Sequence, residues 1–309
     1  MAEVLKNRTE LLFLYEIENA NPNGDPLNEN RPRFDTEDDT IIVSDVRLKR
    51  TIRDYWFEYK GFNGTDGKDI FVRETEYEGT GKDGDKTFVA DGKRRATAFQ
   101  ESRENVLKTC IDIRVFGGVL PLPKDSITLT GPTQFQMGRS LHKTEIITEQ
   151  GTGAFASGDG KGQATFRTEY KVPYALIGFN GIINEKAAKY STMSDDDKDL
   201  LIDGVWQGTK NLISRSKFGQ NPVLLLAINY KENKPFYIGS LRQRVKLISD
   251  KNDKAIRGLE DFTLDFAGVI AEIKANLDNI ESVEIKVDSR LKFVQTLKIT
   301  DGKLDLNTL

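Results

Sequence analysis

A basic segment that opens a predicted helix has the side chains and the spacing to bind phosphate groups. The segment SDVRLKRTIRDYWFEY, residues 44–59, begins with a predicted N-cap, and apolar residues recur along one helix face. Phosphates are held by Arg and Lys side chains and by the free N–H groups of a helix start. The candidates in this segment are Ser44, Arg47, Lys49, Arg50 and Arg53.

Lys49 and Arg50 are the strongest individual candidates in this basic segment. We expect neither of them to meet an acidic side chain four residues further along the helix, which would leave both free for a ligand. The alternative interpretation is an ordinary solvated helix face, because exposed Lys and Arg are common on protein surfaces.

A second polar surface is predicted in GPTQFQMGRS, residues 131–140. Successive strand side chains point to opposite faces, so Gln134, Gln136 and Gly138 are expected on one face. Phe135 and Met137 are expected on the opposite, core-facing side. The polar side chains that could line a ligand path are Gln134, Gln136, Arg139 and Ser140. An edge strand whose polar side meets water is the alternative.

Several motifs that resemble cofactor or catalytic sites lack a required feature. NANPNGD imitates a calcium loop, but Asn30 stands where the bidentate Glu is needed. GTGAFA, residues 151–156, fits a dinucleotide fingerprint, yet SGDGKG follows it and cannot open a helix. Cys110 and His142 are better interpreted as a buried thiol and an unrelated histidine than as a nucleophile and its base. We therefore expect no metal and no cofactor.

Composition limits the class of protein. The 309 residues are 38% hydrophobic and 30% charged, which is typical of a globular chain. Lys and Arg number 45 against 48 Asp and Glu, so an anionic ligand must be held by local arrangement and not by bulk charge. A single cysteine excludes an internal disulfide, and the sequence shows no signal-peptide core and no membrane-spanning apolar run. We expect a cytoplasmic protein.

The elements that position these residues follow a recognisable order. Periodicity predicts a strand, a helix, two strands, a helix and a strand, at 9–20, 44–59, 126–147, 169–180, 194–215 and 222–230. Another helix is expected over 98–118, and a helix and a strand pair at 263–280, 282–287 and 292–299. The core order predicts an α+β, ferredoxin-like or RRM-like fold, with two helices on one sheet face and the other face open to a ligand.

Six segments in this order carry a resemblance to a known family: NANPNGDP, SDVRLKRTIRDY, DIRVFGG, GPTQFQMGRS, ALIGFN and DLLIDGVWQGTKNLISRSKFG. Together they resemble the Cas-seven family, the guide-RNA-binding backbone subunits of type I CRISPR surveillance complexes (Cascade). The resemblance is strongest to the subtype I-B branch, with similarity also to I-C, and extends from about residue 9 to about residue 230.

The resemblance implies an RRM-like palm with insertions in one domain, residues 1–309. By position, 61–96 would form a finger-like insertion, 142–168 a thumb hairpin, and 245–309 a C-terminal helix and strand extension of the palm. Family members stack head to tail along a guide RNA, and each thumb folds over the strand so that a base is periodically flipped out. They act as scaffolds without a catalytic residue.

The resemblance also extends the set of RNA-binding candidates. In the loop after the first strand, a glycine lets the backbone approach a sugar-phosphate chain, and amide side chains offer donors and acceptors without charge. In the predicted thumb, an aromatic ring could wedge against a displaced base, or pack under its own loop. The added candidates are Asn21, Asn23, Gly24, His142, Phe155, Arg167, Arg215 and Lys217.

Two functions from different classes follow. The first is a non-catalytic scaffold that oligomerises along CRISPR guide RNA (crRNA) and presents the spacer to target DNA in antiviral defence. Its expected partners are other copies of itself, the guide 5′-end-capping subunit, the large and small subunits and the guide-processing endonuclease, with no membrane. The second is a type III-like subunit that cleaves target RNA with a loop carboxylate, Asp25, Asp35 or Asp45. A remote third class, a nucleotide-dependent enzyme, would use GTGAFA and retain NAD.

Overall fold

The central sheet is built around the apolar strand β1, Thr9–Ala20. A computed structural model describes residues 3–81, 84–121, 126–152 and 166–308. β1 lies between β13, Phe166–Ile183, and β14, Gln220–Tyr230, and is antiparallel to both. Ten of the twelve β1 residues are buried, in keeping with a strand that is covered on both faces.

Further strands extend the sheet on both sides of this centre. The strand order is β18-β19-β17-β14-β1-β13-β11-β5-β4, with β10 and β12 also paired to β13. The added strands are β4 Phe34–Asp35, β5 Thr40–Val43, β10 Thr133–Phe135, β11 Gly138–Ser140, β12 Ile147–Thr152, β17 Ile280–Val287, β18 Ile299–Thr300 and β19 Lys303–Leu304. The protein therefore combines helices with an antiparallel sheet, as the sequence predicts.

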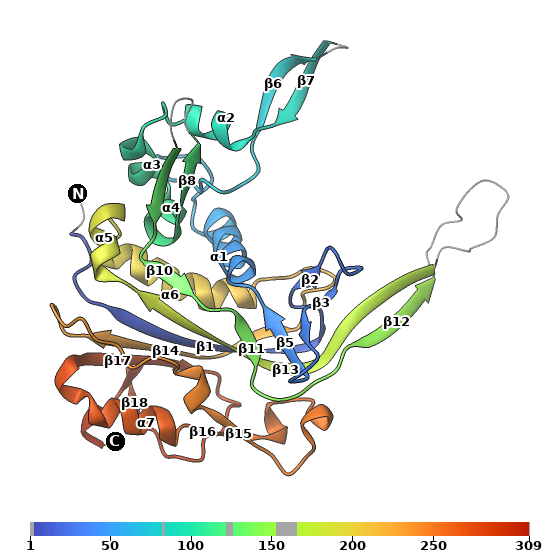
Figure 1. Ribbon diagram of the computed structural model, residues 1–309, viewed down its shortest axis with the longest axis vertical. Helices are drawn as coiled ribbons and strands as arrows, with labels where there is room; N and C mark the ends of the chain where they lie inside the picture. The colour runs from blue at the N-terminus through green and yellow to red at the C-terminus, as the bar shows by residue number, and fades with distance from the viewer. Residues whose placement is uncertain (1–2, 82–83, 122–125, 153–165, 309) are drawn as a thin grey trace.

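Two long helices cover one face of the sheet, α1 Asp45–Tyr59 and α6 Asp195–Lys210 (Figure 1). Each begins at a serine N-cap, and Ser194 forms a reciprocal capping box with Asp197. Trp56 is fully buried between the helices: its Nε1 donates to the Leu200 carbonyl at 2.9 Å. Both helices were predicted, although α6 ends at Lys210, five residues before the predicted boundary.

The second sheet face is also covered, which corrects the prediction of an open face. Residues after β14 pass beneath the sheet with β15 Lys246–Ile248, β16 Thr263–Asp265 and α7 Ala267–Ala275 (Figure 1). They enclose a second hydrophobic core that includes Leu12, Leu14 and Phe266. Residues 292–299, predicted as a strand, contribute only an isolated bridge at Phe293 and the first residue of β18.

Two charged side chains of β1 join the sheet to the residues after β14, which we call the cover of the second sheet face. The Glu10 carboxylate accepts hydrogen bonds from the Tyr230 hydroxyl at 2.6 Å and from the backbone N–H groups of Ile238 and Gly239. The Glu16 carboxylate accepts from Arg290 Nη2 at 2.8 Å. In the sequence these two polar residues suggest a solvated face, but in the structure they are buried and hold the chain after β14 against the sheet by hydrogen bonds.

A separate module with its own small core lies between α1 and β10. It contains β6 Glu76–Gly81, β7 Gly84–Val89, α2 Gly92–Thr97, α3 Arg103–Thr109, α4 Ile111–Phe116, β8 Gly117–Pro121 and β9 Ser126–Thr130. The helix predicted over 98–118 is broken, because Cys110 is extended and forms a β-bridge with Asp69. This core includes Phe71, Val106 and Leu129.

Two hairpins extend away from the body of the molecule (Figure 1). One is β6–β7, and the other is formed by β12 with the first part of β13, from Ile147↔Lys171 to Thr152↔Phe166. β13 thus continues from the projecting hairpin into the centre of the sheet. Among the described residues no helix is long and apolar enough to cross a membrane.

Candidate nucleic-acid interface

The start of α1 and the loop after β1 are held together by backbone capping. Ser44 Oγ accepts from the Arg47 N–H at 3.2 Å, as predicted for an N-cap. The Ser44 N–H donates in turn to Asn23 Oδ1 at 2.8 Å. The structure therefore brings Asn23 and Ser44 together, and Asn23 positions the loop against the helix start.

Contacts within the same loop explain why Asn21 and Gly24 occupy their positions. The loop contains β2 Gly24–Asp25 and β3 Arg31–Pro32. Asn21 is buried and its Nδ2 donates to the Asn30 carbonyl at 2.7 Å. A Cβ at Gly24 would lie 1.9 Å from Asn30 Oδ1, so packing within the loop accounts for this glycine. A close approach of the loop backbone to a sugar-phosphate chain, as predicted, is therefore not needed to explain the glycine at position 24.

Arg47 and Lys217 are two largely buried cations beside this loop. Arg47 Nη2 donates to Thr51 Oγ1 at 3.1 Å, and Lys217 Nζ donates to the Asn21 carbonyl at 2.5 Å. Within the described part of the chain, neither cation forms an ion pair. Burial lowers the pKa of Arg47, and burial together with the Arg47 charge lowers the pKa of Lys217 to about 8. Two desolvated cations without a counter-charge favour an anionic ligand.

The other basic residues of α1 are paired, which corrects the prediction of free side chains. Lys49 Nζ lies 3.0 Å from Asp45, and Arg50 Nε lies 2.7 Å from Asp54, the acidic residue four positions further along. Arg50 remains about half exposed and its pair is a weak surface contact. Both residues therefore stay candidates for phosphate binding, with a competing carboxylate.

Arg53 has a structural partner. Its Nε lies 2.9 Å from Asp112, whose carboxylate is fully buried. Asp112 also accepts from the backbone N–H groups of Phe71 and Val72 at 2.7 and 3.0 Å. Arg53 therefore joins α1 to the β6–β9 module, and we remove it from the RNA-contacting candidates.

The predicted polar strand is interrupted at residues 136–137. Gln134 and Gln136 are both exposed. Gly138 lies instead on the helix-facing side, since a Cβ there would lie 2.4 Å from the Phe179 ring, and Met137 is 59% exposed. The irregularity between β10 and β11 shifts the alternation by one residue, so these parts of the prediction are wrong.

Three further candidates near this strand have internal partners. Arg139 Nη1 lies 2.8 Å from Asp35 and stays partly exposed. Ser140 and His142 are buried: Ser140 Oγ donates to the His142 carbonyl, and His142 Nε2 accepts from the Leu176 N–H. Burial lowers the pKa of His142, which keeps its ring neutral. We remove Ser140 and His142 from the candidate set.

The base of the β12–β13 hairpin carries charged pairs. Arg167 and Arg215 both pair with Glu169 and are more than half exposed. Phe155 lies outside the described residues. The loop after β1 contacts this hairpin too, because the Arg31 guanidinium lies 4.3 Å from the centre of the Tyr170 ring.

Sequence reasoning missed two exposed apolar side chains near these groups. Phe218 follows Lys217 directly and is 70% exposed, and Leu27 in the β2–β3 loop is 97% exposed. An exposed ring beside cations is suited to base stacking. The signal was present in SRSKFG, where a phenylalanine follows two basic residues before a glycine.

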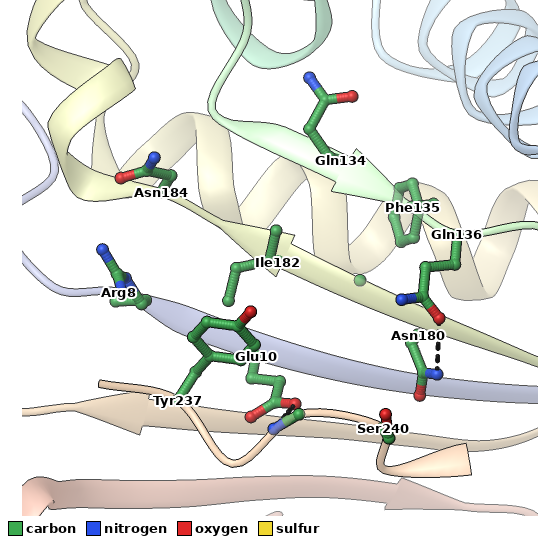
Figure 2. A pocket seen from close by; sticks show the side chains of 12 residues that line it. Arg8, Glu10, Gln134, Phe135, Gln136, Asn180, Ile182, Asn184, Tyr237 and Ser240 are labelled. Atoms are coloured by element: carbon green, nitrogen blue, oxygen red, sulfur yellow. Dashed lines mark hydrogen bonds between the residues drawn. The ribbon is translucent and has the colours of Figure 1, made fainter. Parts of the chain in front are cut away.

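A cavity of about 330 Å³ lies at the far end of the sheet, where β1 begins and β13 ends (Figure 2). Gln136 and Asn180 meet in it, with Asn180 Nδ2 donating to Gln136 Oε1 at 3.0 Å. Its charged groups already have partners, because Arg8 forms an ion pair with Glu185 and the Glu10 carboxylate accepts the hydrogen bonds described above. The cavity therefore offers neutral amides and the Tyr237 ring, with no unpaired cation for phosphate.

The loop carboxylates do not form a metal centre in the described part of the chain, where no three His, Cys, Asp or Glu side chains cluster. Asp35 pairs with Arg139 and Asp45 with Lys49, and Arg139 lowers the pKa of Asp35. Asp25 lies 3.5 Å from Arg33 and accepts from the Leu27 N–H. Each of the three carboxylates thus has a local structural partner.

The fold matches subunits of solved assemblies. A chain in "CRISPR RNA-guided surveillance complex, pre-nicking" aligns with a TM-score of 0.54 and 10% identity, covering 94% of this chain and 96% of that chain. A chain in "CRISPR RNA-guided surveillance complex" aligns with a TM-score of 0.53 and 10% identity, covering 94% and 95%. The mixed helix-and-sheet architecture is therefore one found in CRISPR surveillance complexes.

The sequence identifies the family. Residues 7–267 match the family described as CRISPR-associated protein Cas7. The CRISPR-associated protein Cas7 of Haloferax volcanii is 29% identical over an alignment of 313 positions, which covers 93% of this chain and 88% of that protein. The chain belongs to the Cas7 family, and the matched region includes part of the cover that follows β14.

Proposed function

We propose that this protein is a crRNA-binding scaffold that oligomerises along the guide and forms the backbone of a CRISPR surveillance complex. Its membership of the Cas7 family is the observation that carries the proposal. Arg47 and Lys217, two cations that form no ion pair with any residue the structure describes, lie beside a capped helix start and support it chemically. The protein holds the RNA backbone, and base pairing with invading DNA reads the sequence.

The covered sheet decides where RNA can bind. An RRM usually stacks bases on its open sheet face, but here both faces are buried. The proposed RNA path therefore runs along the rim, past the loop after β1, the start of α1 and the base of the β12–β13 hairpin. Arg47, Lys217, Lys49, Arg50, Arg215 and Phe218 are the side chains that we assign to it.

We base the assignment of palm, fingers and thumb on the strand order β14-β1-β13-β11, with α1 and α6 on one face of the sheet. We interpret this part as an RRM-like palm, the β6–β9 module as fingers and the β12–β13 hairpin as the thumb. Type I, and within it subtype I-B, is the assignment we favour. The partners are guide RNA, target DNA through pairing, further copies and the other complex subunits, in the cytoplasm. Because Asp25, Asp35 and Asp45 have structural partners, we assign no catalysis.

Electron microscopy of the purified protein with and without guide RNA tests this proposal. We expect filaments or regular arcs only when RNA is present, because each subunit contributes a modest contact and the RNA links the copies. Incubation with complementary RNA and magnesium should leave that RNA intact. Protein that stays monomeric beside RNA, or that cleaves it, would contradict the scaffold assignment.

The lowered pKa of Lys217 predicts pH-dependent RNA binding. A phosphate favours the charged ammonium, which is half lost in the free protein at about pH 8, so affinity should fall as the pH rises from about 7 to 9. Lys217→Arg stays charged and should flatten this dependence. Fluorescence anisotropy with labelled RNA at constant ionic strength measures it, and an unchanged profile in Lys217→Arg would remove Lys217 from the interface.

The lowered pKa of Lys217 also affects the stability of the fold, which should increase with pH while RNA affinity decreases. The pKa of Lys217 is lower in the folded protein than its ordinary value of 10.5, so the folded state disfavours the charged form. This penalty is present below about pH 8 and is relieved as the pH rises from about 8 towards 10.5. Weaker RNA binding above pH 8 therefore cannot be attributed to Lys217-linked unfolding.

A further inference from the structure

A small, partly open pocket beneath α1 contains hydrogen-bond donors that have no partner among the described residues. Its volume is about 10 Å³, roughly the space for one water or one monatomic ion. It lies among β1, α1, α6 and β14 and is lined by Arg47, Gln220 and Thr51, among others. Arg47 Nε and Gln220 Nε2 are buried and have no hydrogen-bond partner among the described residues.

The remaining polar side chains of the lining, the hydroxyls of Tyr15, Thr51 and Thr209, form no hydrogen bond with either of these two donors. Thr51 Oγ1 donates to the Arg47 carbonyl and accepts from Arg47 Nη2, and Thr209 Oγ1 donates to the Val205 carbonyl. Gln220 is only 6% exposed, so bulk water does not solvate its amide. The pocket is therefore bordered by donors next to a guanidinium that has no ion pair in the described part of the chain.

We propose that this pocket is a binding site for a monatomic anion, chloride under ordinary conditions, coordinated by Arg47 Nε and Gln220 Nε2. A water would satisfy the two donors but would leave the buried charge uncompensated, whereas an anion does both. The ion would tie α1 to the first residue of β14 from inside the protein. The site shares Arg47 with the proposed RNA path, but its second ligand, Gln220, lies outside that path, and an anion can occupy the site in the RNA-free protein.

Thermal unfolding at constant ionic strength tests the site. Replacing glutamate by chloride as the anion is expected to raise the Tm of the RNA-free protein by about 2–4 °C, and the rise should level off as the site fills. Gln220→Glu supplies the negative charge from the protein and should abolish the halide response. Arg50→Met, which removes an exposed cation, is the matched control and should retain it.

Bromide provides a direct measurement. Crystals grown in sodium bromide should show an anomalous peak between Arg47 and Gln220. Equal Tm values in chloride and glutamate, with no peak, would overturn the proposal: they would indicate a water, or a Gln220 amide whose oxygen faces Arg47. The halide response is measured on the RNA-free protein, whereas the scaffold proposal is tested by filament formation of the unmodified protein with RNA, so a failure of one is distinguishable from a failure of the other.

Discussion

Asp112→Ala is expected to lower the free energy of unfolding by about 3–5 kcal/mol. The substitution leaves the Arg53 guanidinium in a largely buried position without its counter-charge. It also removes the acceptor for the Phe71 and Val72 N–H groups, which fix the β6–β9 module to α1. Denaturant unfolding followed by tryptophan fluorescence measures the change, because Trp56 lies in the core next to Phe116.

Asp54→Ala is the matched control for this experiment. It breaks the exposed pair with Arg50 on the same helix and should cost at most about 1 kcal/mol. Asp112→Asn should fall between the two, since it keeps acceptor capacity but loses the charge. Equal effects of Asp112→Ala and Asp54→Ala would show that the buried carboxylate does not hold the module in place.

Shortening the β12–β13 hairpin should abolish RNA-driven assembly without unfolding the protein. Residues 150–168 would be replaced by Asn-Gly, which suits a tight turn between the paired Glu149 and Glu169. The described residues of the removed segment, 150–152 and 166–168, lie outside the three hydrophobic cores, so the Tm should be preserved. If the hairpin links neighbouring copies, affinity for a long guide RNA should fall by about 10²–10⁴-fold through lost avidity.

A short RNA that a single subunit covers provides the control. Its affinity should change far less, because the side chains at the start of α1 remain in place. Binding to both RNAs can be followed by fluorescence anisotropy, and assembly by sedimentation. Filaments of normal length from the shortened variant would contradict the role of this hairpin in assembly.

The long elements of the fold could be predicted from sequence because their patterns are local. β1 and β14 are apolar runs that end at turn residues, and α1 has both a serine cap and an apolar stripe. The covered second face could not be predicted in the same way. Glu10 and Glu16 have the alternation of solvated residues, and their partners Ile238 and Arg290 lie more than 200 positions away.

In the candidate site, too, contacts between residues close in the sequence could be predicted, and contacts that depend on tertiary packing could not. The pairing of Arg50 with Asp54 is legible in the sequence, since the two stand four residues apart, and the expectation that Arg50 is unpaired was wrong for that reason. The pairing of Arg53 with Asp112 depends on tertiary packing and could not be foreseen. Local capping by Ser44 was predicted, whereas the absence of an ion pair between Lys217 and any carboxylate of the described residues could be seen only in the structure.

The cover over the second sheet face has a consequence for how this protein can change over evolutionary time. Both hydrophobic cores beside the sheet are closed by the chain itself, and the surfaces assigned to the ligand lie at its rim, on the start of α1, the loops and the β12–β13 hairpin. Substitutions that adapt those surfaces to a new guide or a new neighbour would leave interior packing unchanged. The protein can therefore diversify at its periphery while the architecture that carries it stays constant.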